Sequence, residues 1–168
     1  MSGHFERHGL VRPALATSLL DVRCMIRDQR HPIRDFMTTA PHSIGRDQTL
    51  AAALERMRTF QVRHLPVLDG GRIVGVLSQR DVLFVETLRD VDPAKVTVED
   101  AMSTEVYAVT EQTPLRDVAL EMLEHKYGCV VVLDHGRVAG IFTAVDALRV
   151  LAALLEQPSA GGRRAGVR

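Results

Sequence analysis

The sequence has few aromatic residues and no net charge. Aromatic side chains make up 4% of the 168 residues, and tryptophan is absent. Proteins that bind single-stranded nucleic acid rely on aromatic side chains for base stacking, so this scarcity disfavours that mechanism. The 21 Lys and Arg residues are balanced by 21 Asp and Glu residues, whereas binding through nucleic-acid phosphates needs a basic surface. We therefore expect no nucleic-acid partner.

Cysteines and long apolar runs are also scarce. The two cysteines, Cys24 and Cys129, are too few for a disulfide framework or a four-thiolate zinc site. No uncharged run approaches the ~18 apolar residues that a membrane span requires. The apolar stretch at 14–20 is short and is followed at once by charged residues, which is not the pattern of a signal peptide. These absences predict a cytoplasmic protein with no membrane partner.

The chain contains one pattern twice. Residues 35–39 (DFMTT) return as 100–104 (DAMST), an offset of 65 residues, and 67–72 (VLDGGR) return as 132–137 (VLDHGR). The same register continues without a gap from 35–83 onto 100–148. A chance match would not hold one offset over this length, so the sequence is interpreted as a tandem duplication.

Each copy predicts the same order of helices and strands. Apolar residues at helical spacing indicate a first helix, with Leu50, Ala53, Leu54 and Met57 in one copy and Leu115, Val118, Ala119, Met122 and Leu123 in the other. Thr49 is the expected N-cap of one helix, and Thr113 that of the other, with Pro114 at its first position. Short β-rich runs at 65–68 and 73–77, and at 130–133 and 138–142, enclose Asp-Gly-Gly and Asp-His-Gly and predict hairpins. With short strands at 43–44 and 107–109 and second helices at 79–88 and 144–155, the predicted unit is β-α-β-β-α.

A unit of this size buries little surface alone, so two units are expected to pack together. The predicted fold class is α/β (α+β), with two repeats related by pseudo-twofold symmetry. The expected boundaries are an N-terminal extension at 1–34 with an amphipathic helix, repeat 1 at 35–88, a linker at 89–99, repeat 2 at 100–155 and a disordered tail at 156–168.

Six short motifs carry a family resemblance. They are DFMT at 35–38, RHLPVLD at 63–69 and GVLSQRD at 75–81, and then DAMS at 100–103, VVVLD at 130–134 and GIFTAVD at 140–146. In order, spacing and duplication they resemble a tandem pair of CBS (cystathionine β-synthase) domains, called a Bateman module. The resemblance implies a stand-alone, non-catalytic regulatory protein that binds an adenine nucleotide, or a related adenosyl ligand, between the repeats. It also implies a homodimer.

Two matched motifs are the candidate ligand sites. Ser78 and Asp81, like Thr143 and Asp146, follow a predicted strand and open a predicted helix. Ser/Thr-x-x-Asp is the pattern of a capping box, which satisfies the free N–H groups of a helix. The same geometry lets the carboxylate accept both ribose hydroxyls while the hydroxyl and helix N–H groups hold phosphate. The family resemblance implies this second role, with Asp81 and Asp146 as ribose ligands, and capping does not exclude it.

The two copies differ in nearby cations. Arg63, His64 and Arg80 are placed to meet phosphate in the first copy. Their counterparts in the second copy are Gly128, Cys129 and Val145, with Lys126 as the nearest remaining cation. We therefore hypothesise that AMP, ADP or ATP binds beside Asp81, and that the site beside Asp146 binds weakly or prefers a less charged adenosyl compound. No cofactor is required.

Other functions are less well supported by the sequence. A scaffold that assembles with an unidentified protein, without nucleotide, is the main alternative. A hydrolase using Ser78 with His64 and Asp81 is disfavoured, since Cys129 occupies the position matching His64 and no Gly-x-Ser-x-Gly motif occurs. A phosphate loop of the Gly-x-x-x-x-Gly-Lys type is absent, so a bound nucleotide would be sensed and not hydrolysed. His4 and His8 lack a clustered carboxylate, so no metal site is expected.

Overall fold

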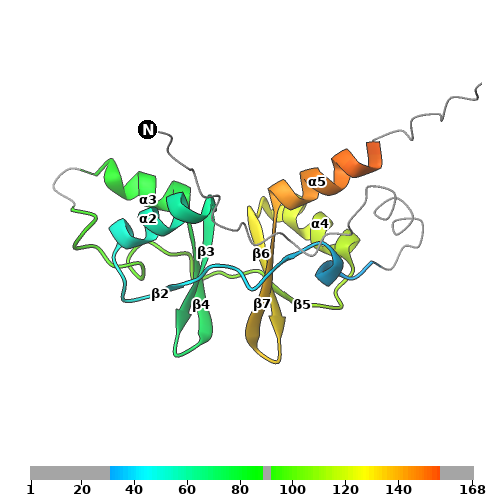
Figure 1. Ribbon diagram of the computed structural model, residues 1–168, viewed down its shortest axis with the longest axis horizontal. Helices are drawn as coiled ribbons and strands as arrows, with labels where there is room; N and C mark the ends of the chain where they lie inside the picture. Colours follow the sequence, from blue (N-terminus) through cyan, green and yellow to red (C-terminus); the bar gives the residue numbers. More distant parts are fainter. Residues whose placement is uncertain (1–30, 89–91, 156–168) are drawn as a thin grey trace, which may run out of the picture.

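The computed structural model describes residues 31–88 and 92–155. The first half contains a 3-10 helix η1 (Ile33–Asp35) and then β1 (Thr38–Thr39), β2 (Ile44–Gly45), α2 (Leu50–Phe60), β3 (His64–Asp69), β4 (Arg72–Ser78) and α3 (Gln79–Glu86). The second half contains β5 (Ala108–Thr110), α4 (Leu115–His125), β6 (Cys129–Asp134), β7 (Arg137–Thr143) and α5 (Ala144–Leu155). The predicted mixed fold with two β-α-β-β-α repeats is confirmed (Figure 1). The amphipathic helix predicted within 1–34 falls largely outside the described residues.

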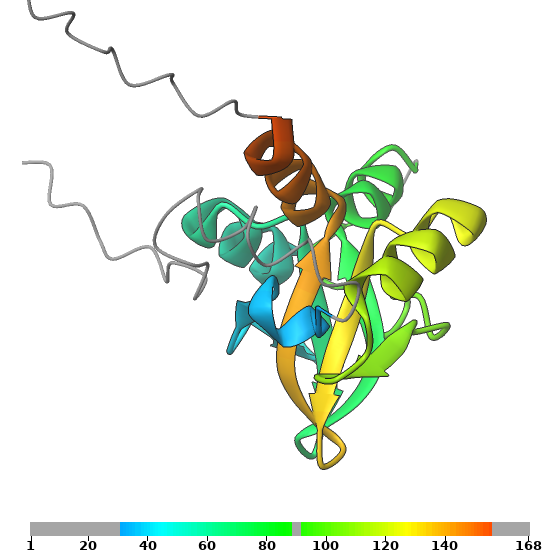
Figure 2. The ribbon, with the colours of Figure 1, turned by 90° about the vertical axis from the view of Figure 1, so that its right-hand side faces the viewer.

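Each repeat builds its own small sheet. Strands β2, β3 and β4 form one sheet, and β1, β7, β6 and β5 form the other. In both sheets the short strand that precedes the helix pairs in parallel with the next strand, and that strand forms an antiparallel hairpin. The four α-helices lie on one side of the molecule and the hairpin turns point to the opposite side, as both ribbon views show (Figures 1 and 2). The ends of β4 and β7 therefore deliver α3 and α5 to the same side.

The segment that precedes each repeat packs on the other repeat. Strand β1 pairs with β7 of the second repeat, and the N–H of Ile33 donates to the carbonyl of Thr113 at 2.9 Å. Reciprocally, the N–H of Val98 donates to the carbonyl of Gln48 at 2.8 Å. Ile33, Phe36 and Met37 lie in the core of the second repeat, and Val98 lies in that of the first. This exchange ties the two cores together and was not predicted from the repeat pattern.

A repeated glycine makes room for the exchanged segments. A Cβ on Gly75 would lie 2.5 Å from Sδ of Met102 and 2.9 Å from the carbonyl oxygen of Ser103. A Cβ on Gly140 would clash in the same way with Sδ of Met37. Such distances are too short for real side chains, so only glycine allows the methionine of the opposite segment to cross the strand. The identities Gly75/Gly140 and Met37/Met102 in the sequence are explained by this packing.

The first helix of each repeat receives part of its cap from the exchanged segment. The N–H of Ala52 donates to Oγ1 of Thr49 at 3.2 Å, which confirms Thr49 as an N-cap. The prediction for Thr113 was wrong, because Pro114 takes the N-cap position and α4 begins at Leu115. There the N–H of Leu115 donates to the carbonyl of His31 at 2.8 Å, an acceptor that is distant in the sequence.

The predicted hairpins and most of the predicted helix faces are also observed. Gly70 and Gly71 have φ of +55° and +82°, and His135 and Gly136 have +46° and +78°, as the two-residue turns require. The buried residues of α2 are those predicted: Leu50, Ala53, Leu54 and Met57. On α4 the prediction was too wide, because Ala119 is exposed and Leu123 is 76% exposed, while Val118 and Met122 are buried.

Candidate functional site

A cleft of about 1580 Å³ opens between the two repeats. Single small-molecule sites usually occupy about 300–1,000 Å³, so this cleft has room for two ligands. Its walls come from matching places in both repeats, namely the segments after β1 and before β5, the turns that lead into β3 and β6, and the starts of α3 and α5. All seven candidate residues line it: Arg63, His64, Ser78, Arg80, Asp81, Thr143 and Asp146.

The two Ser/Thr-x-x-Asp motifs form nearly identical capping boxes. Oδ2 of Asp81 accepts from the N–H and the hydroxyl of Ser78 at 2.9 and 2.7 Å, and the N–H of Asp81 donates back to Oγ of Ser78 at 3.3 Å. Thr143 and Asp146 repeat the three distances. The cap therefore uses one carboxylate oxygen in each repeat. The other oxygen, Oδ1, is not needed by the cap.

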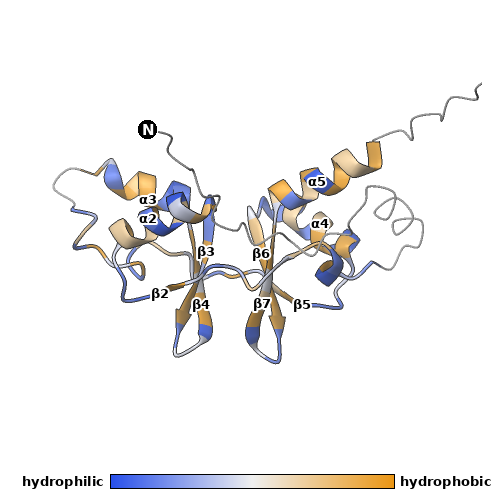
Figure 3. Ribbon diagram, in the orientation of Figure 1, coloured by the Kyte–Doolittle hydropathy of each residue, from blue (hydrophilic) through white to orange (hydrophobic). Residues whose placement is uncertain are grey.

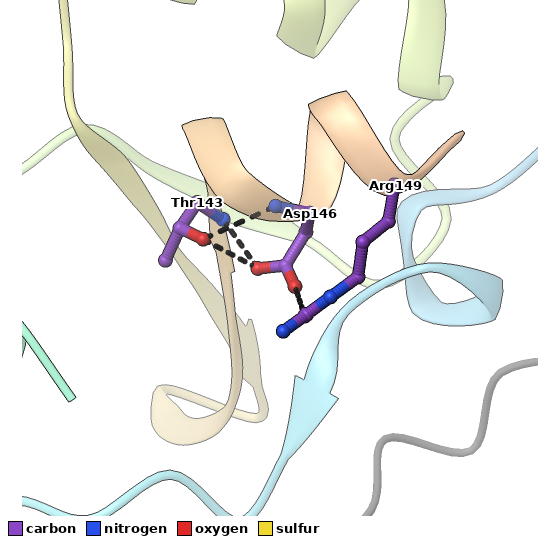
Figure 4. Close-up of polar contacts among 3 residues, drawn as sticks. All are labelled: Thr143, Asp146 and Arg149. Atoms are coloured by element: carbon purple, nitrogen blue, oxygen red, sulfur yellow. Dashed lines mark hydrogen bonds and ion pairs between the residues drawn. The ribbon is translucent and has the colours of Figure 1, made fainter. Parts of the chain in front are cut away.

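The second oxygen differs between the repeats. Oδ1 of Asp146 accepts a hydrogen bond from Nη1 of Arg149 at 2.5 Å, one turn further along α5 (Figure 4). The side chain of Asp146 is 5% exposed and that of Arg149 is 54% exposed. The position in repeat 1 that matches Arg149 holds Phe84. Within the described residues, Oδ1 of Asp81 has no hydrogen-bond or ion-pair partner.

The predicted cationic side chains gather beside Asp81. His64 is opposite Ser78 in the β3–β4 pairing. Burial lowers the pKa of His64 from its usual value of 6.5, and the negative charge of Asp81 opposes that shift. The positive charges of Arg63 and Arg80 lower the pKa of His64 further. These interactions put two arginines, the imidazole and the carboxylate within electrostatic reach of one another.

His64 also extends toward the second repeat. A Cβ on Gly128 would lie 2.8 Å from Nε2 of His64. Gly128 is the counterpart of Arg63, and Cys129 is the counterpart of His64. Thus the imidazole of His64 fills the space that a side chain at position 128, just before β6, would need. This contact joins the two halves of the cleft.

The geometry does not favour nucleophilic catalysis. The hydroxyl of Ser78 donates to Asp81 at 2.7 Å, whereas a hydrolase triad would place a histidine between hydroxyl and carboxylate. Burial raises the pKa of the Cys129 thiol to about 11, so the group is a neutral thiol at physiological pH. Among residues 31–88 and 92–155, no cluster of three or more His, Cys, Asp or Glu side chains is placed to hold a metal ion. His4 and His8 lie outside the described residues.

Two aromatic pairs on the cleft walls were missed by the sequence reasoning. The rings of His42 and Phe60 stack with centroids 3.6 Å apart, and those of Tyr107 and Tyr127 stack at 5.3 Å. Burial raises the pKa of Tyr107. His42 and Tyr107 occupy the same position in the two repeats, and this correspondence could have identified them. Flat rings of this kind suit a heterocyclic base.

The described residues also bear on membrane insertion. None of the helices in 31–88 and 92–155 has the length and apolar character needed to cross a membrane.

Known proteins share both the repeated domain and the fold. Residues 33–86 and 98–153 each match the model of the CBS domain family, about two-thirds of the chain in all. Hypoxic response protein 1 of Mycobacterium tuberculosis is 29% identical over 119 residues, which cover 70% of this chain and 83% of the relative.

Two similar crystal structures contain ligands. The CBS domain pair of protein MJ0100, in complex with 5′-methylthioadenosine and S-adenosyl-L-methionine, is 25% identical with a TM-score of 0.65 and covers 72% of this chain and 99% of its own. The cytosolic domain of the Mg²⁺ channel MgtE, in complex with ATP, is 27% identical with a TM-score of 0.61 and covers 75% of this chain and 51% of its own.

Proposed function

Because the chain belongs to the CBS domain family and carries the domain twice, we propose that it is a cytoplasmic, non-catalytic regulatory module. It binds an adenine nucleotide or a related adenosyl ligand in the cleft between the repeats. The observation that carries the proposal is the pair of capping boxes, since each directs an aspartate, Asp81 or Asp146, into one shared cleft.

Each capping box has the chemistry that a nucleoside needs. Ribose hydroxyls are donors, and a carboxylate oxygen beyond the cap accepts from them. The hydroxyls of Ser78 and Thr143 already donate to Asp81 and Asp146. We therefore expect phosphate to be held by the N–H groups at the starts of α3 and α5 that the caps do not use, and a hydroxyl reaches phosphate only by releasing its carboxylate. The aromatic pairs His42–Phe60 and Tyr107–Tyr127 supply flat walls for the base.

The half-cleft around Asp81 is suited to a charged ligand. Arg63, His64 and Arg80 line the cleft, and the charges of Arg63, Arg80 and Asp81 all act on His64. An arginine forms strong bidentate bonds with phosphate. This favours AMP, ADP or ATP there. The half-cleft around Asp146 has Val145 where the first has Arg80, which favours a ligand with less negative charge. Similar structures have been solved with both classes, ATP and the adenosyl compounds.

The ligand would act by shifting a conformational or assembly equilibrium. A nucleotide in the cleft contacts side chains of both repeats, so it stabilises the arrangement in which both reach it. Exposed apolar side chains on the helices support a homodimer: Phe84 and Leu88 in and after α3, Leu120 and Leu123 on α4, and Leu148, Leu151 and Leu155 on α5. Figure 3 shows apolar residues along α3 and α5. Burying such residues against a second copy removes them from water.

The same exposed residues favour the second candidate function, a scaffold that docks a protein partner and binds no nucleotide. Thermal shift separates the two functions. A ligand that binds only the folded protein stabilises it by about 2.7 kcal/mol at one hundred times its Kd. For a chain of this size that raises the Tm by roughly 5–10 °C. The probes are AMP, ATP, 5′-methylthioadenosine and S-adenosyl-L-methionine, each at millimolar concentration.

Asp100 provides a matched control for the two site aspartates. Its Oδ2 accepts from the N–H and hydroxyl of Thr97 at 3.0 and 2.6 Å, as in the two caps, whereas the N–H of Asp100 donates to the carbonyl of Thr97 at 3.2 Å; Asp100 does not line the cleft. We expect Asp81→Asn to abolish the AMP-induced shift and Asp100→Asn to retain it. If none of the four probes raises the Tm, the scaffold function is favoured. If Asp81→Asn and Asp100→Asn reduce the AMP-induced rise in Tm equally, the cap supports only folding.

A further inference from the structure

One internal ion pair, between Arg149 and Asp146, is found in the second half of the cleft and has no counterpart beside Asp81 among the described residues. Nη1 of Arg149 bonds to Oδ1 of Asp146 (Figure 4). Both residues line the cleft. A carboxylate has about four lone-pair positions on two oxygens. Oδ2 of Asp146 already accepts two hydrogen bonds from Thr143. Arg149 therefore occupies one of the two acceptor positions on the remaining oxygen, and the two hydroxyls of a ribose would need both.

Repeat 1 lacks this ion pair. Phe84 takes the place of Arg149 and is 66% exposed, and it does not line the cleft. Its aromatic ring offers no donor to a carboxylate. The cap around Asp81 is otherwise the same, bond for bond. The difference at the second carboxylate oxygen thus arises from a single residue position in the duplication.

We propose that Arg149 acts as a latch on the second ligand site. This inference rests on the proposed function, because the latch regulates access of an adenosyl ligand to Asp146. A ribose that donates both of its hydroxyls to Asp146 requires the guanidinium to leave Oδ1. Arg149 is half exposed while Asp146 is buried, so the arginine is the partner that swings into water.

The latch makes the two sites fill at different ligand concentrations. When only a fraction of a site is competent, its apparent Kd rises by the inverse of that fraction. A charge-assisted hydrogen bond to a buried carboxylate corresponds to a factor of about 10–100 in binding. The Asp81 site therefore fills first, and the Asp146 site responds only at higher concentrations. One chain would then respond to two ranges of ligand concentration.

Calorimetric titration of the full chain with AMP and with 5′-methylthioadenosine, which has no phosphate, tests the latch. In the Arg149→Gln variant we expect the second-site Kd to fall about 10–100-fold for both probes. Asp146→Asn in that background should remove the gained site. Arg137→Gln, an exposed residue outside the cleft with the same change in charge, should leave both sites as in the unmodified chain.

The reciprocal variant keeps the test valid if Arg149→Gln unfolds. Phe84→Arg adds a guanidinium three residues after Asp81, on an exposed position of α3. It should weaken the first site by a similar factor, since it reproduces the spacing of Arg149 and Asp146. Circular dichroism melts of each variant establish that it is folded at the titration temperature.

The outcomes separate the latch from the proposed function. If the unmodified chain binds ligand and Arg149→Gln leaves the second site unchanged, the latch is overturned and the proposed function stands. If Arg149→Gln lowers the second-site affinity for AMP but not for 5′-methylthioadenosine, Arg149 is a phosphate ligand and the latch is overturned. If neither the unmodified chain nor Arg149→Gln binds either probe, both proposals fail. Binding that appears only in Arg149→Gln supports the latch.

Discussion

The two repeats have kept the same packing while their cleft-facing side chains have diverged. Each repeat has a glycine that admits a methionine from the opposite segment, Gly75 with Met102 and Gly140 with Met37. By contrast, the cleft positions that hold Arg63, His64 and Arg80 in the first repeat hold Gly128, Cys129 and Val145 in the second. The packing positions are constrained by both cores at once, because each glycine and the methionine that crosses it belong to different repeats.

The comparison indicates where specificity resides. The carboxylate and hydroxyl of the capping box are present twice with the same distances, so they account for what the two sites share. The first half has Arg63 and Arg80 beside His64, whereas in the second half Arg149 forms an ion pair with Asp146. We infer that the duplication supplies two nucleoside sites and that single substitutions around them set which ligand each prefers.

The largest expected effect concerns the shared packing. Gly140→Val places carbon atoms where Sδ of Met37 lies, and Gly75→Val does the same with Met102. Overpacking of a core usually costs about 1–3 kcal/mol, and here it also expels an exchanged segment. We expect each variant to lower the Tm by roughly 5–10 °C in thermal unfolding. If the segments are exchanged as described, Met37→Ala should restore part of the loss in Gly140→Val and none in Gly75→Val.

The second effect addresses the charge difference. Arg80→Ala should weaken AMP binding about tenfold, since a charge-assisted hydrogen bond to phosphate is lost. Binding of 5′-methylthioadenosine should be unaffected, because it has no phosphate. Calorimetry with both probes measures the contrast. The matched change in the second repeat, Val145→Arg, should increase the affinity of the second half-cleft for AMP. If Arg80→Ala lowers the affinity for AMP and for 5′-methylthioadenosine equally, Arg80 does not contact the phosphate.

A smaller effect distinguishes the caps of the two first helices. Thr49→Ala removes the acceptor for the N–H of Ala52 and should cost about 1 kcal/mol, a typical value for an N-cap. Thr113→Ala should change the free energy of unfolding very little, because α4 is capped by the carbonyl of His31. Chemical denaturation of the two variants measures the difference. A comparable loss in Thr113→Ala would contradict the cap described for α4.

The smallest effect is a pH dependence contributed by His64. The folded pKa of His64 is lowered, chiefly by burial, so below its unfolded value of about 6.5 the unfolded chain binds more protons than the folded chain. Stability should therefore fall as the pH drops from 7.5 through 6.5 toward the lowered pKa. The His64→Gln variant should lack this part of the pH dependence. Thermal melts of both proteins over the same pH range measure the difference. An identical pH profile in the two proteins would contradict the assignment.

Local patterns in the sequence predicted the repeat, the hairpins, most element boundaries and the capping-box motifs. Three features escaped prediction, and two of them depend on contacts between residues far apart in the sequence. The exchange of segments 31–39 and 96–103 between repeats leaves no local signal, and it also explains why Thr113 was wrongly assigned as a cap. The stacked aromatic pairs come from positions separated by a whole helix. The third feature, the ion pair of Arg149 with Asp146, is a local contact within the predicted helix, and its spacing of three residues could have identified it.

The central claim is that one cleft contains two unequal adenosyl sites. Its most direct test is calorimetric titration of AMP into the unmodified chain, Asp81→Asn and Asp146→Asn. We expect Asp81→Asn to remove the tighter binding event and Asp146→Asn to leave it within a factor of about two, because the cations and the unoccupied carboxylate oxygen lie beside Asp81. Equal losses of AMP affinity in the two variants would contradict the claim.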